Sequence, residues 1–234
     1  MIIKYLIVEE ANEFISIAAL IGEPARAAML WNLLDGRAYT ASELAITAGI
    51  SSTSASNHLS KLLEADLLKV EAQGRHRYFS FARPEVAYVV ESLASLTNTG
   101  NAMKNNKAII PQIKYCRSCY DHLAGFVGVK ITEALEKKGS IIKAGKAYNI
   151  TQRGWKLFQH LDITEKNIPA SRRALTRQCL DWSERRPHLA GQLGALLLDQ
   201  MLQKKWFKKI QHSRELLITA TGKSELYSLL GIEV

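Results

Sequence analysis

Apolar side chains fall three or four positions apart in four stretches before residue 65, which is the spacing of one helix face. Glycines at the ends of these stretches separate the predicted helices, because glycine readily ends a helix. Thr40 followed by Glu43 has the form of a capping box and marks the start of the third helix. The predicted helices lie at residues 8–21, 24–36, 41–48 and 52–63.

The hydrophobic pattern then changes to the alternation of β-strands. Residues 68–71 and 76–81 flank a turn that contains Gly74 and Arg75, so they predict a β-hairpin with a basic tip. Pro84 begins another helix, which is expected to run to residue 96, and the Asn-, Thr- and Gly-rich segment after it is typical of a linker. We therefore expect a first domain at residues 1–98, a linker at 99–111 and a second domain at 112–234.

The second half of the chain contains an internal duplication. The motif His-Leu-Ala-Gly at His122 recurs at His188, and an Ile-Thr-x-x-Gly turn that begins at Ile150 recurs from Ile218. Two short motifs repeated in register indicate two copies of one unit. Each copy is predicted to fold as a helix, two short strands and a second helix, and the copies are expected to pack about a pseudo-twofold axis.

The segment from Ser52 to Leu68 resembles the recognition helix of ArsR/SmtB-type transcriptional repressors, and the segment from Gln73 to Phe79 is similar to their wing. The resemblance covers residues 9–97 and implies a winged helix-turn-helix domain that binds double-stranded DNA. The Ile-Thr-x-x-Gly turn resembles the wing exit of other winged-helix domains. The expected fold class is therefore mainly α with small β-hairpins (α+β), with an N-terminal winged helix-turn-helix and a C-terminal domain of two winged-helix-like repeats.

Short polar side chains at the start of the fourth predicted helix suit a surface that reads the major groove, because base edges come close to such a helix end. Basic side chains on the wing have the geometry for phosphate or minor-groove contacts. A capped surface helix and a solubilising hairpin tip would look the same singly, and their pairing favours DNA binding. The expected DNA-binding residues are Ser52, Thr53, Ser54, Ser56, Asn57, His58, Lys61, Arg75, His76 and Arg77.

The formal net charge of +9 suggests a polyanionic partner, but it is unevenly distributed. Residues 1–100 hold 8 Lys and Arg against 11 Asp and Glu, a net charge of −3, and residues 101–234 carry the remaining +12. The bulk charge therefore does not identify the interface. The basic half is either solvated surface or an auxiliary DNA contact, for example through Lys204, Lys205, Lys208 and Lys209.

The metal sites that the resemblance would imply are missing from the first domain. ArsR-type repressors hold metals through a Cys pair on the helix before the recognition helix, or through Asp and His residues on the last helix. The corresponding residues 42–47 and 85–91 contain neither Cys nor His. Any effector site is therefore expected elsewhere in the chain.

All three cysteines lie near the repeated His-Leu-Ala-Gly motif. At helical spacing, Cys116, Cys119 and His122 would share one face, and a twofold arrangement would bring Cys179 and His188 close to them. Thiolates with imidazoles suit Zn²⁺, Cu(I) or a thiophilic metalloid such as arsenite, so these five residues are the candidate metal or effector ligands.

Two other interpretations of the cysteine motif stay open. One is a packing motif, because Cys is among the most buried residue types and small residues allow close helix packing. The other is a site for thiol redox chemistry or for a small molecule. The residues that flank the motifs and could serve a small molecule are Tyr120, Asp121, Trp182, Glu184, Arg185 and Arg186.

Several classes of protein find no support in the sequence. The content of 47% hydrophobic and 23% charged residues is that of a globular protein. No apolar run approaches the ~20 residues that a membrane span needs, and no secretory signal pattern opens the chain. An odd number of cysteines argues against a disulfide framework and favours the cytoplasm. The motifs of phosphate-binding loops and hydrolases are absent, so an enzyme is not expected.

The resulting hypothesis is a cytoplasmic, homodimeric transcriptional repressor that an effector, sensed in the C-terminal domain, releases from DNA. An apolar face at Phe14, Ile15 and Ala18 would provide the contact between subunits. The alternative is an interaction or adaptor protein whose winged helices bind other proteins. The polar recognition helix favours DNA over that alternative.

Overall fold

The computed structural model describes residues 2–94, 96, 112–211 and 213–234. The chain divides into two compact units, Met1–Glu91 and Ser92–Val234. Both units combine helices with small antiparallel sheets, so the fold is α+β as the sequence predicts. The expected linker at residues 99–111 lies outside the described residues.

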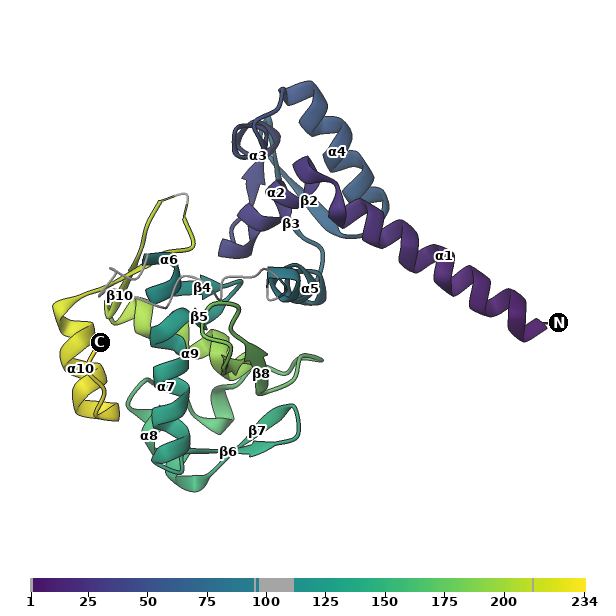
Figure 1. Ribbon diagram of the computed structural model, residues 1–234. Helices are drawn as coiled ribbons and strands as arrows, with labels where there is room; N and C mark the ends of the chain where they lie inside the picture. The colour runs from purple at the N-terminus through teal and green to yellow at the C-terminus, as the bar shows by residue number, and fades with distance from the viewer. Residues whose placement is uncertain (1, 95, 97–111, 212) are drawn as a thin grey trace, which may run out of the picture. The chain divides into compact units, whose positions relative to one another are not determined.

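The first unit has the element order of a winged helix-turn-helix (Figure 1). Its three-stranded sheet has the order β1–β3–β2, with Tyr39 opposite Phe79 and Leu68 opposite Phe81. The sequence did not predict β1, the short strand at the base of the hairpin. The elements are α1 (Ile2–Gly22), α2 (Pro24–Asn32), β1 (Tyr39–Thr40), α3 (Ala41–Ala48), α4 (Ser52–Glu64), β2 (Leu68–Gln73), β3 (His76–Phe81) and α5 (Pro84–Ala94).

Local capping fixes where the helices of the first unit begin. Both halves of the predicted capping box are present at α3, since the Thr40 side chain accepts from the Glu43 backbone N–H and Glu43 accepts from that of Thr40. Gly49 ends α3 in the left-handed conformation, with a φ of 67°. The Ser51 side chain then caps α4 by accepting from the Ser54 N–H at 3.2 Å. The turn between α3 and α4 is thus set by adjacent residues.

The rotation of α4 about its axis is fixed by its buried side. Ala55, Leu59 and Leu62 are buried and pack towards α2, α3 and β2. Burial of each leucine contributes about 1.5–3 kcal/mol. The polar side of the helix is therefore held outward by the core of the unit.

The second unit consists of two copies of one structural repeat, preceded by α6 (Gln112–Tyr115). Each copy runs hairpin, 13-residue helix, second hairpin and shorter helix. The first copy comprises β4 (Arg117–Cys119), β5 (His122–Ala124), α7 (Gly125–Lys137), β6 (Ile141–Ala144), β7 (Ala147–Ile150) and α8 (Gln152–Gln159). The second comprises β8 (Arg177–Leu180), β9 (Pro187–Ala190), α9 (Gly191–Gln203), β10 (Phe207–Lys209), β11 (Leu216–Ile218) and α10 (Ala220–Leu230).

The first hairpin of each copy corrects the sequence prediction. Cys119 and His122 were expected on one helix face together with Cys116, whereas they are opposite each other across the hairpin β4–β5. Only Tyr120 and Asp121 connect the two strands, and Tyr120 has a φ of 59°. Glycine or asparagine usually occupies such a turn position, so this turn leaves no signal in the sequence.

The repeated Ile-Thr-x-x-Gly motif has the same structure in both copies. Thr151 caps α8 and Thr219 caps α10, each accepting from the N–H of a glycine three residues later and donating to a backbone carbonyl at 2.7 Å. A Cβ at Gly154 or Gly222 would clash with a backbone carbonyl oxygen of the preceding turn. The motif therefore marks a close approach that only glycine allows.

The two copies pack reciprocally in the second unit (Figure 1). Helix α7 of the first copy contacts β9 of the second, and α9 contacts β5 of the first. Strands β5 and β9 also lie side by side, and Leu123, Val127, Leu189 and Leu193 belong to one continuous core cluster. The two copies therefore share a core.

No single helix among the described residues is long and apolar enough to cross a membrane. The segments Ala11–Gly22 and Pro24–Asp35 reach that length and composition only together, with a bend of 75° between them. Most of the second segment's apolar side chains are buried in the core of the first unit.

Candidate nucleic-acid interface and a buried polar cluster

The outward side of α4 carries a stripe of short polar side chains. Of the residues predicted to contact DNA, Ser52, Thr53, Ser56, Asn57 and Lys61 are exposed. The Ser56 hydroxyl donates to the Ser52 carbonyl at 2.9 Å, which leaves its lone pairs on the outer side. Small polar groups on a well-held helix can approach base edges closely, and amide and hydroxyl groups donate and accept there.

Two of the predicted residues are less accessible. Ser54 is half-buried, and His58 turns towards the start of α2. His58 Nδ1 lies 3.3 Å from Arg26 Nη1 and 3.3 Å from Glu23 Oε2. The structure therefore gives His58 a role in joining α4 to α2, which differs from the exposed position that the sequence suggested.

Ser60 was not predicted, although it is exposed and lies one helical turn after Ser56 and Asn57. Its position on that face follows from the 3.6-residue period. Ser60 extends the polar stripe towards Lys61, and it belongs to the same candidate surface.

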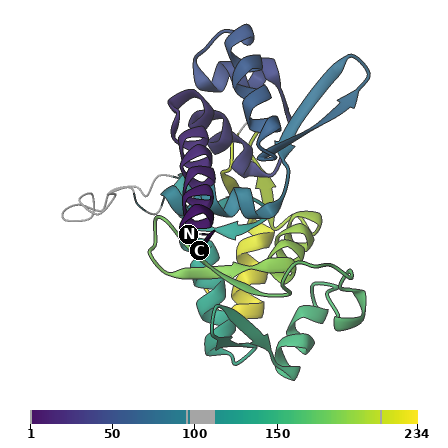
Figure 2. The same ribbon diagram turned by 90° about the vertical axis from the view of Figure 1, so that its right-hand side faces the viewer.

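The hairpin β2–β3 projects from the rest of the first unit as a wing (Figure 2). Gly74 adopts a φ of 59° at its tip, and the three predicted wing residues Arg75, His76 and Arg77 are all exposed. The Arg77 guanidinium lies 5.7 Å from the ring centre of Phe79, which supports its side chain on the strand. The wing thus presents two guanidinium groups at the tip of a paired strand ladder.

An apolar surface is exposed on α1. Phe14 is 73% exposed and Ile15 is 60% exposed, and Ala18 on the same helix is also exposed. Exposed large apolar side chains on one helix are typical of a surface that another protein chain covers. These are the three positions that the sequence predicts for a contact between subunits.

A second group of polar side chains is buried inside the second unit. Cys119, His122, Cys179 and His188, here called the Cys₂His₂ cluster, offer four ligand atoms that lie within 4.8 Å of one another. The two histidine Nε2 atoms are 3.1 Å apart, and the two Sγ atoms are 3.9 Å apart. Cys179 is partly exposed, and the other three residues are fully buried. The duplication therefore brings together residues that are 60 to 66 positions apart.

Asp121 supports the first histidine of the cluster. His122 Nδ1 lies 3.1 Å from Asp121 Oδ1, and Arg173, which lies just before the second copy, donates to the same carboxylate. Burial raises the pKa of Asp121, but the hydrogen bonds from His122 and Arg173 lower it by more than burial raises it. The pKa of Asp121 is therefore below its usual value, and the carboxylate stays ionised. Burial lowers the pKa of His122, but Cys119 and Asp121 raise it more.

Asp181 supports the second histidine from the opposite side. His188 Nδ1 lies 3.1 Å from Asp181 Oδ2, a close ion-pair contact between two buried side chains. The same oxygen accepts from Arg117 at 3.0 Å and from the Gly125 N–H at 2.7 Å. Burial raises the pKa of Asp181, but His188 and Arg117 lower it far more. Burial lowers the pKa of His188, and Asp181 and Cys119 raise it to about 9. Each aspartate thus joins the histidine of its own copy to an arginine that lies 52 or 64 residues away in the chain.

Cys116 stays apart from the Cys₂His₂ cluster, which corrects the expectation that it joins the site. It is fully buried in the apolar core cluster, and it is not among the converging ligands. Burial raises the pKa of its thiol, so the thiolate that a metal needs is disfavoured. For this cysteine the packing interpretation fits the structure.

The residues considered for a small-molecule site have structural contacts. The Arg117 guanidinium stacks on the Trp182 ring at 4.6 Å, so Trp182 forms part of the wall around the buried ion pair. Arg186 pairs with Glu133 and Glu184 at the surface. These contacts account for the positions of Trp182, Glu184 and Arg186 without a ligand.

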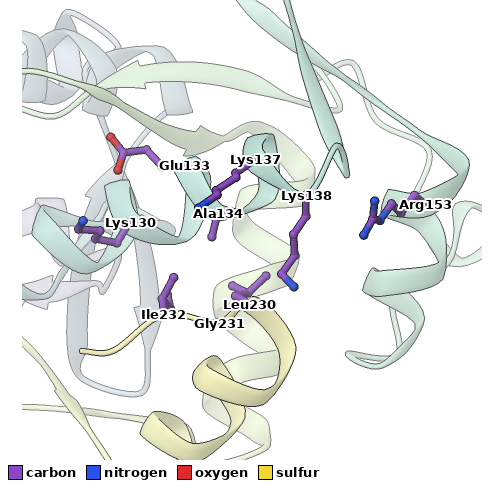
Figure 3. A pocket seen from close by; sticks show the side chains of 9 residues that line it. All are labelled: Lys130, Glu133, Ala134, Lys137, Lys138, Arg153, Leu230, Gly231 and Ile232. Atoms are coloured by element: carbon purple, nitrogen blue, oxygen red, sulfur yellow. The ribbon is translucent and has the colours of Figure 1, made fainter.

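An open pocket of about 530 Å³ lies between α7, α8 and the last residues of the chain (Figure 3). Its basic side chains are spread along the pocket instead of converging on one point, and they are at least partly exposed. The pocket therefore accounts for part of the positive charge of the second unit, and we assign it no ligand. Its lining residues are Lys130, Glu133, Ala134, Lys137, Lys138, Arg153, Leu230, Gly231 and Ile232.

Comparison with known proteins bears on both units. Residues 21–71 match the family described as "Helix-turn-helix domain". The chain is 39% identical over 220 residues to the HTH-type transcriptional regulator YdfF of Bacillus subtilis (strain 168), and the match covers 93% of this chain and 97% of that protein. A match of this length includes the duplicated second unit.

Solved structures match a smaller part of the chain. NolR from Sinorhizobium fredii is 26% identical, with 37% of this chain and 85% of NolR covered and a TM-score of 0.34. The homodimeric winged helix-turn-helix DNA-binding domain of Mb0332 from Mycobacterium bovis, a possible ArsR-family regulator, is 20% identical over 37% of this chain and 79% of that domain, with a TM-score of 0.34. By the relation to YdfF and the helix-turn-helix match, the chain belongs to the HTH-type transcriptional regulators with an ArsR-like DNA-binding domain.

Proposed function

We propose that this regulator is a homodimeric repressor. The polar stripe of α4 would read the operator, and the wing would contact the flanking DNA backbone. The observation that carries the proposal is the pairing of an exposed, core-anchored polar helix face with a projecting hairpin that ends in two exposed arginines. Side chains on α4 suit base edges in the major groove, and the wing arginines suit phosphates.

The homodimer is supported by the exposed apolar surface of α1. Phe14 and Ile15 would leave a large apolar area in water in a monomer, whereas a second copy would cover it. Two copies also present two recognition helices, which matches two half-sites about one helical turn apart.

An effector that acts through the second unit is the remaining part of the proposal. The Cys₂His₂ cluster is where metal-ligating side chains converge among the described residues. An effector that releases a repressor must bind more tightly to the form with low affinity for DNA. We therefore place the effector response in the duplicated unit.

Operator binding is tested with the DNA upstream of the protein's own coding region, by fluorescence anisotropy over a series of salt concentrations. Asn57→Ala should reduce the discrimination between operator and unrelated duplex by about 1–3 kcal/mol, because a bidentate base contact is lost. Arg75→Ala should weaken binding to every duplex and reduce the slope of log K against log salt by about 0.9.

Arg83→Ala is the matched control, because Arg83 is an exposed arginine at the base of the same hairpin, where it pairs with Asp66. It should leave both the discrimination and the salt slope unchanged. Full operator binding by both Asn57→Ala and Arg75→Ala would contradict the assigned surface. A lack of any salt-dependent DNA binding would instead support the adaptor alternative.

A further inference from the structure

The Cys₂His₂ cluster has the dimensions of a tetrahedral zinc site. Structural zinc sites bind Cys sulfur at about 2.3 Å and His nitrogen at about 2.0–2.1 Å. Tetrahedral angles then separate two sulfurs by about 3.8 Å and two nitrogens by about 3.3 Å. The corresponding distances in this structure are 3.9 Å and 3.1 Å. We propose that Cys119, His122, Cys179 and His188 bind one Zn²⁺ ion between the two repeats.

Each repeat supplies one sulfur and one nitrogen from equivalent positions. Cys119 lies opposite His122 in β4–β5, and Cys179 lies opposite His188 in β8–β9. Strands β5 and β9 lie side by side, so the four ligands come from two adjoining strand ladders. Ligands on paired strands are held in place before the ion arrives, which favours one coordination geometry.

The surroundings of the histidines are those of a metal site. Metal-binding histidines usually direct their second ring nitrogen at a carboxylate, which orients the ring and makes the ligand nitrogen more basic. Asp121 and Asp181 occupy these positions at 3.1 Å from the two Nδ1 atoms. Both carboxylates are fixed in turn by arginines, so the orienting groups are themselves held.

The charges of the site balance when the ion is present. Two thiolates neutralise Zn²⁺, and the two aspartates are neutralised by Arg173 and Arg117. Such a neutral group suits a buried position, where unbalanced charge is costly. Two buried Nε2 atoms that face each other at 3.1 Å need a proton or a cation between them, and zinc supplies the cation.

The geometry also separates zinc binding from its main competitor, a disulfide. The two Sγ atoms are about twice as far apart as the ~2.05 Å of a disulfide bond. A disulfide would require the two Sγ atoms to move closer together, whereas tetrahedral coordination of zinc fits their present separation. The partly exposed Cys179 gives a thiol at the edge of the site, where an ion can enter.

Zinc content is tested on the full-length, untagged protein, purified under anaerobic reducing conditions. We expect one zinc per chain after the metal is removed with a chelator and ZnSO₄ is added back. X-ray absorption spectroscopy should show two sulfur ligands at about 2.3 Å and two nitrogen ligands at about 2.0 Å. Neither measurement depends on a variant that has to fold.

Variants then identify the ligands. Cys179→Ser should lower the zinc content to below about one-tenth per chain, because a structural site needs all four ligands. Cys116→Ala is the matched control, a buried cysteine outside the cluster, and it should retain one zinc. Asp121→Asn should retain the site but weaken its zinc affinity by about 10- to 100-fold, as expected when an orienting carboxylate is lost.

Several results would overturn the proposal. These are no uptake of zinc by the reduced wild-type protein, equal zinc loss in Cys116→Ala and Cys179→Ser, uptake of Cu(I) without zinc, and a Cys119–Cys179 disulfide in the reduced preparation. The binding of zinc does not depend on operator recognition, and only a role as effector rests on the proposed function. Zinc binding without DNA binding would contradict that function alone, whereas DNA binding without zinc would contradict this inference alone.

Discussion

The proposed DNA-reading surface of the first unit and the Cys₂His₂ cluster of the second unit use polar side chains in opposite ways. On α4 the polar groups are exposed, and the buried leucines behind them hold the helix. In the cluster three of the four side chains are buried, and each histidine lies against an aspartate that an arginine holds. Replacing an exposed polar residue on α4 should therefore change DNA binding but not stability, whereas replacing a polar group around the cluster should lower both stability and the affinity for the proposed zinc ion.

The largest effect is expected at Asp181. Asp181→Ala removes the carboxylate that accepts from Arg117 and Gly125, so the buried charge of Arg117 loses its counter-charge. The free energy of unfolding of the second unit should fall by about 3–5 kcal/mol, measured by urea denaturation with tryptophan fluorescence.

The control for Asp181 is Arg186→Ala, which breaks an exposed ion pair with Glu133. Arg186→Ala should lower the free energy of unfolding by no more than about 1 kcal/mol. Equal losses in the two variants would show that the buried pair contributes no more than a surface pair, and the contrast between the two sites would fail.

A smaller effect is expected at the equivalent glycines of the two repeats. Gly154→Ala and Gly222→Ala each place a Cβ against a backbone carbonyl oxygen, so each should lose about 1–3 kcal/mol of unfolding free energy. Gly22→Ala is the control, because nothing lies within 4 Å of a Cβ at that position. It should be neutral or slightly stabilising. Thermal denaturation gives the comparison, and very unequal losses at Gly154 and Gly222 would contradict the structural equivalence of the copies.

Ser51, which caps α4, and Ser60, on its polar side, separate structural from binding roles at one helix. Ser51→Ala removes the cap and should cost about 1 kcal/mol of stability. Ser60→Ala changes an exposed side chain and should leave stability within about 0.5 kcal/mol, yet weaken operator binding measured by anisotropy. A stability loss at Ser60 without an effect on DNA binding would exclude it from the interface.

The smallest effect is a pH dependence at Glu23. The hydrogen bond from the Arg26 backbone N–H holds the pKa of Glu23 below its usual value; burial opposes this, and the Ala25 N–H and His58 add to the lowering. The ionised carboxylate therefore stabilises the folded state above the pKa of the unfolded chain, and this contribution is lost as pH falls through the lower folded pKa. Glu23→Gln should show less loss of thermal stability than the wild type between about pH 5 and pH 3. An identical acid profile for the two proteins would contradict this role.

The sequence predicted the elements whose signals are local. The capping box at Thr40, the polar face of α4 and the wing all follow from neighbouring residues, and each is present. Strand β1 has two residues and exists only because β3 lies beside it, so no local pattern could predict it. The hairpin β4–β5 was missed for a similar reason, because its turn at Tyr120 lacks the residues that normally mark one.

The candidate metal site likewise combines local signals with long-range contacts that the sequence does not show. The residues in and near the repeated motif indicated all four ligands. The assumption of helical spacing wrongly added Cys116, which lies in the apolar core. Asp121 was considered only for a small molecule, and Asp181 was not considered at all. Their roles depend on arginines that are 52 and 64 residues away, and such pairings have no local signal.

The reciprocal packing of α7 and α9 has a consequence for synthesis of the chain. The first unit is complete by residue 91, so it can fold while the ribosome is still translating the rest. Helix α7 must wait until β9 has emerged, and β5 must wait for α9, which ends at Gln203. Contacts between such distant segments slow folding. The nascent protein should therefore carry a folded DNA-binding unit well before its second unit is formed.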